Sequence, residues 1–347
     1  MSITKRSSYW DNLKFILISL VVAGHFIEPL MGNSHVITVI RDWIYLFHMP
    51  AFIFISGVFS KKIYTKNDGF QVDTVIYYFS LFALFLISLY LWRFVVLDIS
   101  DAKFSPFVIS GIPWYLLALA ALCFSIPFFS SIKGGWKTVI PLLVVLALAA
   151  SLNKNFDDFL AIGRIVAYAP FFYAGFFVSR QGYENLIEKL KTRGWVVFLA
   201  VLFLLGVFVF QYFVPTDFLN ALAKISTGRN PFAVITTYSN ISLIFIKILW
   251  YVLAATMIFA VSLIVSTQKT LFSELGSRTL QVYLLHPLIY YSLSHFGFYK
   301  TAFVTSTTPY IVVILIFSAI VATALLALPK APDKVLKALR KIIRLKA

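Results

Sequence analysis

The stretch DNLKFILISLVVAGHFIEPL, residues 11–30, decides the fold class. It is apolar over roughly the ~20 residues that a helix needs to cross a bilayer. It nevertheless carries Lys14 at one end and His25 and Glu28 deep inside. A charge at mid-bilayer costs about 2.5 to 3.5 kcal/mol on insertion scales, so ionisable groups inside a span predict a functional site.

The rest of the chain belongs to the same class. Of its 347 residues, 60% are hydrophobic, 18% aromatic and only 13% charged, far from the soluble average. Apolar runs of spanning length predict an all-α, polytopic membrane bundle of about ten helices, with one membrane domain at 1–330 and a tail at 331–347. The predicted spans are 13–31, 38–60, 74–97, 107–130, 138–152, 159–179, 195–214, 238–266, 279–293 and 309–328. A proline in the ninth span predicts a kink rather than an end.

Basic residues set the orientation. With the N-terminus inside, the inner segments hold 20 lysines and arginines, among them Lys5, Arg6 and Lys66, and the outer loops hold five. Cytoplasmic loops are enriched in lysine and arginine, so we expect a multi-pass protein of the cell membrane with both termini in the cytoplasm. This bias accounts for most of the net charge of +16. We therefore predict the lipid bilayer as a partner, and no nucleic acid.

The tail KAPDKVLKALRKIIRLKA is predicted to be a basic amphipathic segment. Apolar residues fall on one helical stripe and basic residues opposite: Val335, Leu336, Leu339, Ile342 and Ile343 against Lys334, Lys337, Arg340, Lys341 and Arg344. Such a helix lies on an anionic inner leaflet. A disordered, solvated tail is the alternative.

Other common signatures are missing from the sequence. The single cysteine, Cys123, excludes an internal disulfide and a cysteine metal cluster. No two histidines have the i, i+4 metal spacing, so we predict no metal and no bound cofactor. The first apolar run exceeds a signal-peptide core and lacks a cleavage site, so we expect it to remain as the first helix.

Lys14 and His25 are predicted to share one helix face. Eleven residues make three turns plus ~20°, which separates the two by about 16 Å. Lys14 then lies at the cytoplasmic edge and His25 past the midplane, where Glu28 at i+3 can orient the imidazole and raise its basicity. The alternatives are a snorkelling lysine and a packing histidine.

The second span offers further candidates: Arg41, Asp42, His48, the pair Ser56 and Gly57, and then Lys61 and Lys62. Ser-Gly allows close helix approach, so packing competes with a catalytic role. For Lys61 and Lys62, anchoring at the inner face is the alternative to a functional role.

Two more ionisable groups lie in later spans. Arg164 is deep enough for function, although pairing with Asp42 or Glu28 would satisfy it structurally. His286 precedes Pro287, which leaves backbone groups of the helix without hydrogen bonds. His286 either takes part in catalysis or satisfies these backbone groups. We interpret Lys247 as snorkelling or packing.

Five segments together resemble a known family. They are DNLKFILISLVVAGH, FHMPAFIFISGVFSKK, PWYLLALAAL, RIVAYAPFFYAGFFVSR and GSRTLQVYLLHP. In this order they resemble membrane acyltransferase family 3, and in particular its fucose 4-O-acetylase-like branch, over residues 10–290.

The resemblance implies an integral enzyme that moves an acyl group, usually acetyl, from cytosolic acyl-CoA to a hydroxyl of an extracytoplasmic sugar. Acetyl-CoA is then a co-substrate. The motifs match Lys14 to the basic position and His25 to the catalytic histidine, with His48, Ser56, Gly57 and His286 in further motifs and Trp114 in the third segment. Two departures are an inner loop with lysines in place of arginines and the absence of a WS...E motif.

The expected chemistry is O-acyl transfer. Lys14, Lys61, Lys62 and Arg41 are the predicted acyl-CoA contacts, and His25, oriented by Glu28, is the predicted base. His48, Ser56 or Arg164 would donate to the thioester oxyanion. The outer segment 214–237, with Asp217, Phe218 and Phe232, would receive the sugar. Direct transfer and an acyl-enzyme both remain open.

Two other classes remain as alternatives. A transporter of a lipid-linked sugar or a proton-coupled solute also uses buried ionisable groups, but it predicts inverted repeats or matching broken helices, and the sequence has neither. A non-catalytic subunit working with polysaccharide-assembly proteins would tolerate loss of His25.

Overall fold

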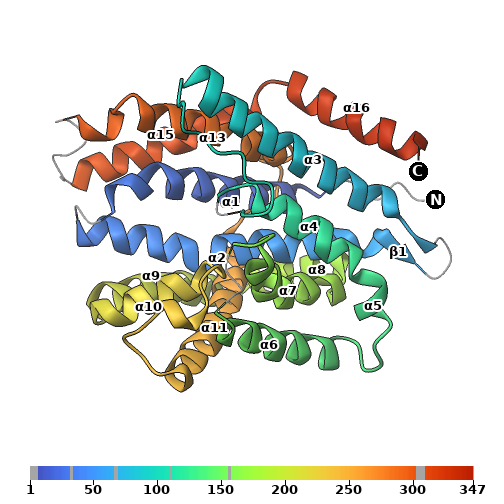
Figure 1. Ribbon diagram of the computed structural model, residues 1–347. Coiled ribbons are helices and arrows are strands. Elements are labelled where there is room, and N and C mark those ends of the chain that lie inside the picture. Colours follow the sequence, from blue (N-terminus) through green and yellow to red (C-terminus); the bar gives the residue numbers. More distant parts are fainter. Residues whose placement is uncertain are drawn as a thin grey trace. The chain divides into compact units, whose positions relative to one another are not determined.

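The described part of the chain is predominantly helical (Figure 1). The computed structural model describes residues 7–31, 34–65, 69–109, 111–154, 158–301 and 309–346. Lys5, Arg6, Lys66 and Asp157 lie outside these ranges. Within them, the only two-stranded sheet is the small antiparallel hairpin of β1 (Tyr64–Thr65) and β2 (Gly69–Phe70). The predicted all-α class is confirmed.

The chain divides into two compact units. Unit 1 comprises Met1–Ile44, Tyr183–Tyr212 and Met257–Val335, and unit 2 comprises Tyr45–Gly182, Phe213–Thr256 and Leu336–Ala347. Helices wholly or mostly in unit 1 are α1 (Ser8–Ile27), α8 (Arg180–Lys191), α9 (Gly194–Phe213), α12 (Leu271–Gly276), α13 (Thr279–His295) and α15 (Pro309–Ala327). Those of unit 2 are α3 (Val72–Leu91), α4 (Trp114–Phe124), α5 (Ile126–Ser130), α6 (Trp136–Leu152), α7 (Ile162–Phe177), α10 (Thr216–Ser226) and α16 (Ala331–Lys346). Both α2 (His35–Phe59) and α11 (Asn240–Ile264) contribute residues to each unit.

Short irregular helical turns also occur. Among the described residues, four are 3-10 turns, at Glu28–Leu30, Ser60–Ile63, Phe232–Val234 and Phe298–Lys300. A π-helical turn, Trp92–Val96, extends α3. Pro29 lies in the first turn after α1, and because proline cannot donate the next helical hydrogen bond, α1 ends at Ile27.

Each predicted span contains a helix, but one prediction fails in detail. The fourth span was expected to run from 107 to 130, whereas α4 begins at Trp114 and breaks at Ser125 before α5. Pro113 directly precedes α4 and Pro127 opens α5, and proline favours the ends of helices over their interiors. In the ninth span, by contrast, α13 continues through Pro287.

Within the described residues, five helical segments are long and apolar enough to cross a membrane by themselves. They are Ser8–Leu30, His35–Ile63, Val72–Val96, Gly194–Phe213 and Asn240–Ile264, and a bent pair, Ile162–Phe177 with Arg180–Lys191, makes a sixth if it counts as one span. Shorter apolar helices accompany them at Trp114–Phe124, Trp136–Leu152 and Ser318–Ala327. The class of multi-helix membrane protein is confirmed, and the number of ten spans stays a prediction.

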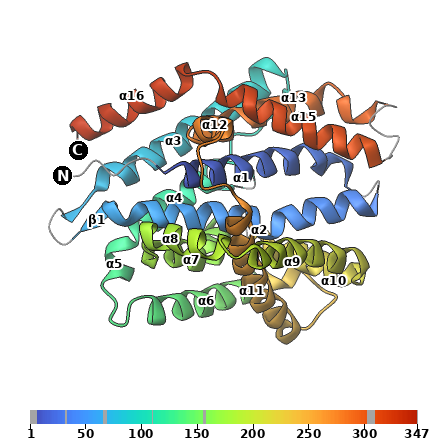
Figure 2. The same cartoon turned by 180° about the vertical axis from the view of Figure 1, so that it is seen from behind.

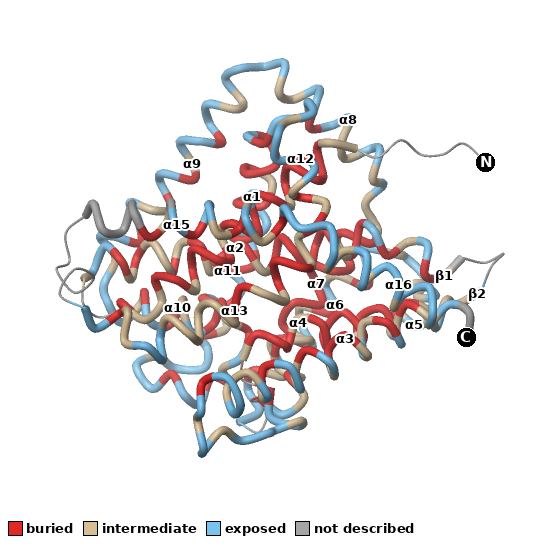
Figure 3. The backbone as a smooth tube through the Cα atoms, turned by 90° about the horizontal axis from the view of Figure 1, so that it is seen from above, coloured by how far each residue is buried: buried red, intermediate tan, exposed pale blue. Residues whose placement is uncertain are grey.

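The core of unit 1 is built around α1, which packs against α12, α13 and α15 (Figure 2). The residues of α1 are buried along almost the whole helix, whereas most of α9 is exposed (Figure 3). Gly276 of α12 explains the closest approach, since a Cβ there would lie 1.8 Å from the Asp11 carbonyl oxygen. The exposed apolar surface of α9 is typical of a helix that faces lipid.

Unit 2 is built from pairs of packed helices, α3 with α4, α6 with α7, and α4 with α7. Its closest helix approach joins α2 and α7. A Cβ at Gly57 would lie 1.9 Å from the Phe172 carbonyl oxygen, and one at Gly175 would lie 2.0 Å from that of Phe54. Small residues at such crossings let helix backbones come together in membranes.

Candidate active site

Lys14 and His25 are the two ionisable side chains of α1 that keep access to their surroundings. Both lie on the single continuous helix Ser8–Ile27, which confirms the predicted helix that joins them. Their side chains are 21% and 19% exposed. Almost every other position of α1 is buried. Lys14 and His25 are therefore the two ionisable groups of the helix that a ligand can reach, and eleven residues of helix separate them.

His25 contacts a carboxylate that is itself paired with a guanidinium. His25 Nδ1 lies 3.2 Å from Glu28 Oε2, and Arg41 NH2 lies 3.5 Å from Glu28 Oε1. Arg41 also pairs with Asp42, whose side chain is almost fully buried. All four residues belong to unit 1. A carboxylate that accepts from Nδ1–H leaves Nε2 as the basic nitrogen of a neutral imidazole.

Within unit 1, Glu28 and Asp42 both contact Arg41. The pairing of either carboxylate with Arg164 stays a prediction. Arg41 is adjacent to Asp42 in the chain and faces Glu28 across the turn between α1 and α2, so it pairs with both at short range. The contacts of Arg41 described here are to carboxylates, and its predicted contact with acyl-CoA stays a prediction.

A second histidine lies beside His25. The ring centroids of His25 and His286 are 5.4 Å apart, and Tyr290 lies 5.9 Å from His25. His286 is fully buried, and its Nδ1 lies 3.0 Å from the Val282 carbonyl oxygen. A carbonyl only accepts, so Nδ1 carries the proton and Nε2 a lone pair. Nε2 has no hydrogen-bond partner within the part of the chain that the structure describes.

The end of α1 that carries Lys14 is fixed by polar contacts. Lys14 Nζ lies 2.7 Å from Asp11 Oδ1 one turn earlier. Asn12 donates to the carbonyl oxygens of Ser266 and Gln268, and its Oδ1 accepts from the hydroxyls of Thr270 and Ser273. This buried amide uses its donors and its acceptor to hold the segment between α11 and α12 against α1.

In unit 2, the Ser56–Gly57 pair has a clear packing role. Ser56 Oγ donates to the Phe52 carbonyl oxygen at 2.8 Å and lies 2.9 Å from the Tyr115 hydroxyl. Gly57 makes the close crossing with α7 described above. His48 is 4% exposed and lies 4.8 Å from the Tyr45 ring. The packing alternative therefore explains Gly57, while the predicted oxyanion contacts of Ser56 and His48 remain predictions.

The two lysines after α2 differ in their surroundings. Lys61 Nζ donates to the carbonyl oxygen of Phe177, the last residue of α7, at 3.5 Å. A lysine in this position satisfies one of the free carbonyl groups at a helix C-terminus. Lys62 is exposed. The acyl-CoA role predicted for both lysines is untested by these contacts.

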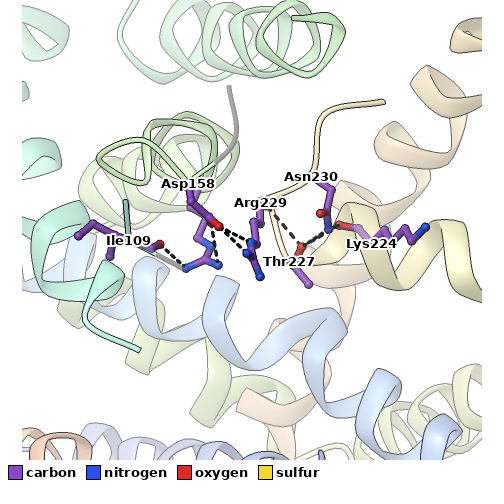
Figure 4. A network of polar contacts seen from close by, with 7 residues as sticks. Ile109, Asp158, Lys224, Thr227, Arg229 and Asn230 are labelled. Atoms are coloured by element: carbon purple, nitrogen blue, oxygen red, sulfur yellow. Dashed lines mark hydrogen bonds and ion pairs between the residues drawn. The ribbon is translucent and has the colours of Figure 1, made fainter. Parts of the chain in front are cut away.

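Arg164 lies in a polar cluster of unit 2 that the sequence did not predict. Its guanidinium lies 5.4 Å from the Trp114 ring centroid, 3.4 Å from the Ile109 carbonyl oxygen and 3.6 Å from Asp158. Figure 4 shows Asp158 reaching also to Arg229, whose Nε donates at 2.8 Å. Asp158 is 71 residues from Arg229 in the chain, so no local sequence pattern could have revealed the pair.

The segment 214–237 differs from the sugar-binding outer loop that the sequence predicts. Much of it is the helix α10, Thr216–Ser226. Phe232 is only 2% exposed, so the expectation that its ring receives a sugar is wrong. The apolar side chain packs inward because burial of an aromatic ring is favourable. Asp217 is exposed and Phe218 is half-buried.

Lys247, in α11, is a buried lysine with a packing role. Its Nζ donates to the Ala147 carbonyl oxygen at 3.1 Å and to the Ser151 hydroxyl, both on α6. These contacts agree with the packing interpretation and give the ammonium group two acceptors inside the helix bundle.

The fold and the site define a polytopic helical membrane protein with a partly exposed histidine–carboxylate network at the end of its first helix. A family model described as an acyltransferase domain matches residues 7–328. The chain belongs to this membrane acyltransferase family and is an acyltransferase. No curated protein and no solved structure shows a significant match. The predicted family is thus confirmed, and its fucose 4-O-acetylase-like branch stays a prediction.

Proposed function

We propose that the protein is an O-acyltransferase that takes an acetyl group from cytosolic acetyl-CoA and places it on a hydroxyl of an extracytoplasmic sugar, most simply one of a surface polysaccharide. Family membership supports acyl transfer over transport. The observation that carries the proposal is the contact of His25 with Glu28 on a helix that also holds Lys14.

His25 acts as the general base. A sugar hydroxyl has a pKa far above 7, so its proton must leave as the oxygen attacks, and a positioned base contributes typically 10²- to 10⁴-fold. Glu28 accepts from Nδ1–H, which leaves Nε2 to take the proton. As positive charge develops on the imidazole, the Glu28 carboxylate stabilises it.

The reaction balances with this one base. The hydroxyl oxygen attacks the thioester carbonyl carbon while its proton moves to His25 Nε2. The tetrahedral intermediate then collapses, the carbon–sulfur bond breaks, and the CoA thiolate takes the proton back from His25. The products are an acetyl ester and CoA, and the enzyme returns to its starting protonation state.

Lys14 has a separate task at the other accessible depth of α1. Acetyl-CoA is a polyanion at its nucleotide end and uncharged along its pantetheine arm. An ammonium group about 16 Å from the base, the rise of eleven helical residues, suits a ligand whose charge and thioester are far apart. Asp11, at 2.7 Å, holds the lysine side chain in place.

The test is base-labile acetyl ester on the surface polysaccharide of cells that lack the gene. These cells are complemented with the wild type, with His25→Ala, or with His295→Ala as a control for loss of an exposed histidine. We expect ester from the wild type and the control but not from His25→Ala. Equal ester from all three would remove His25 from the chemistry and favour a non-catalytic subunit.

A further inference from the structure

One hydrogen-bonding atom of His286 has no partner in the interior of unit 1. The side chain is fully buried, and its Nδ1 donates to the Val282 carbonyl oxygen one turn earlier on α13. This contact explains only one of the two ring nitrogens. Nε2 has no partner within the described residues. Because almost all buried polar atoms in proteins are paired, an unpaired one needs an explanation.

A second unpaired atom lies just after the end of the same helix. Tyr299, in the 3-10 turn Phe298–Lys300, is 8% exposed, and its hydroxyl has no hydrogen-bond partner among the residues that the structure describes. Tyr290 connects the two groups. It shares a face of α13 with His286, four residues earlier, and it interacts electrostatically with Tyr299. His286 and Tyr299 therefore lie near the same tyrosine.

His25 is the accessible member of this group. Its ring centroid lies 5.4 Å from that of His286 and 5.9 Å from that of Tyr290. Its side chain is 19% exposed, whereas His286 is fully buried. All of these residues, Tyr299 included, belong to unit 1. A ligand that reaches them therefore meets the proposed base first, with a second imidazole lone pair behind it.

The unpaired nitrogen of His286 selects the chemistry of its partner. The lone pair of a neutral imidazole only accepts, so its partner has to carry a proton to donate. An ionised carboxylate also only accepts and cannot pair with it, whereas a hydroxyl can. The hydroxyl of Tyr299 both donates and accepts, so another hydroxyl satisfies it as well. Two such groups beside the proposed base fit an uncharged ligand with several hydroxyls.

We propose that the acceptor is a sugar with a free hydroxyl next to the one that is acylated, and that this neighbouring hydroxyl donates to His286 Nε2. The inference rests on the proposed function and names the acceptor class, a vicinal diol whose reacting oxygen loses its proton to His25. A further hydroxyl of the same sugar pairs with Tyr299. Holding the neighbouring hydroxyl orients the reacting one for attack on the thioester. His286 thus determines specificity without taking the proton.

The test compares two probes that differ by one hydroxyl, trans-1,2-cyclohexanediol and cyclohexanol. Each probe competes with the natural acceptor in permeabilised membranes that contain the full chain. Label from radioactive acetyl-CoA is measured there as base-labile ester on the polysaccharide. We expect the diol to inhibit the wild type at an about tenfold lower concentration than cyclohexanol, the factor that one hydrogen bond to an otherwise unpaired group supplies.

The variants show which side chain causes this preference. His286→Phe should lose it, and His286→Gln, which keeps an acceptor, should retain part of it. His295→Phe, a change at an exposed histidine, is the control and should retain all of it. Tyr299→Phe should keep the preference for the diol but lower the incorporation of label.

Equal inhibition by the two probes, or a preference that His286→Phe keeps, would overturn the inference. Equal loss of the preference in His286→Phe and His286→Gln would show that the ring packs and does not accept, with the same consequence. In each of these cases, incorporation that still depends on His25 would leave the proposed function standing. No labelled ester in the wild type would overturn both. Unchanged incorporation in Tyr299→Phe would remove Tyr299 from the site.

Discussion

Replacing Glu28 by Gln is the sharpest test of the proposed catalytic role of His25 and Glu28. The side chain keeps its size but loses the charge that lies 3.2 Å from His25 and 3.5 Å from Arg41. A hydrogen bond to a charged group contributes about 1.5 to 3 kcal/mol. If this energy is realised only when His25 becomes positive, kcat falls by about 10- to 150-fold, because each 1.36 kcal/mol is a factor of ten.

The expected loss is smaller than that of the base itself, for which His25→Gln removes about 10²- to 10⁴-fold. The assay is CoA release from acetyl-CoA by purified protein in lipid vesicles, with the sugar acceptor enclosed on the extracytoplasmic side. The KM for acetyl-CoA should change little, since Glu28 acts on the base and not on the CoA. Glu188→Gln, a change at an exposed glutamate of α8, is the control and should match the wild type.

Two results would refute this reasoning. A Glu28→Gln protein with wild-type kcat would show that the carboxylate does not act through His25. A loss as large as that of His25→Gln, in a protein that unfolds at the same temperature as the wild type, would show that Glu28 itself meets the reacting atoms.

Further predictions concern packing, buried charge and the second histidine. Gly57→Ala should lower the free energy of unfolding by at least about 1 to 3 kcal/mol, because the new Cβ would meet the Phe172 backbone. Gly206→Ala, which has nothing within 4 Å, is the control and should leave the stability unchanged. Thermal unfolding, monitored by thiol labelling of the buried Cys123, measures both. In the same assay Asp158→Ala should cost about 3 to 5 kcal/mol, and unchanged stability would contradict the pairing with Arg164 and Arg229. His286→Phe should reduce kcat while His286→Gln, which retains an acceptor near the position of Nε2, should recover part of it; equal losses in both would indicate packing alone.

The longest apolar helices of this fold, such as Val72–Leu91, Gly194–Phe213 and Asn240–Ile264, are readable from the sequence because each is an apolar run of spanning length. The sequence places the start of the fourth helix too early. The apolar stretch is continuous there, but α4 begins only at Trp114, directly after Pro113. The sequence also misses α10, whose mixed polar and apolar residues resemble a loop until its buried face is seen. Length and hydropathy identify spans and carry little information on breaks within them.

In the candidate site, too, the sequence predicts relations within one helix and misses contacts between separate elements. Lys14, His25 and Glu28 lie on one short stretch, so helical periodicity alone predicted their relation. Arg41 as the partner of Glu28, and Asp158 as a partner of Arg164, depend on how separate elements meet. Each arginine had several carboxylates of equal chemistry in the sequence, and only packing chooses among them.

The burial of α1 explains how one helix can carry both ends of the proposed reaction. Nearly all of its surface is packed, and Gly276 and Asn12 fix its position against α12 and the segment before it. A helix held in this way cannot rotate without breaking many contacts, so the separation and shared face of Lys14 and His25 are constant. The proposed acyl-CoA substrate would have to match this fixed spacing, because the backbone of α1, and not a flexible loop, sets the distance between Lys14 and His25. Moving the lysine by one residue would turn it ~100° away from the histidine, and for this reason a Lys14→Ala protein that also carries Phe15→Lys should fail to recover the affinity for acetyl-CoA that Lys14→Ala loses.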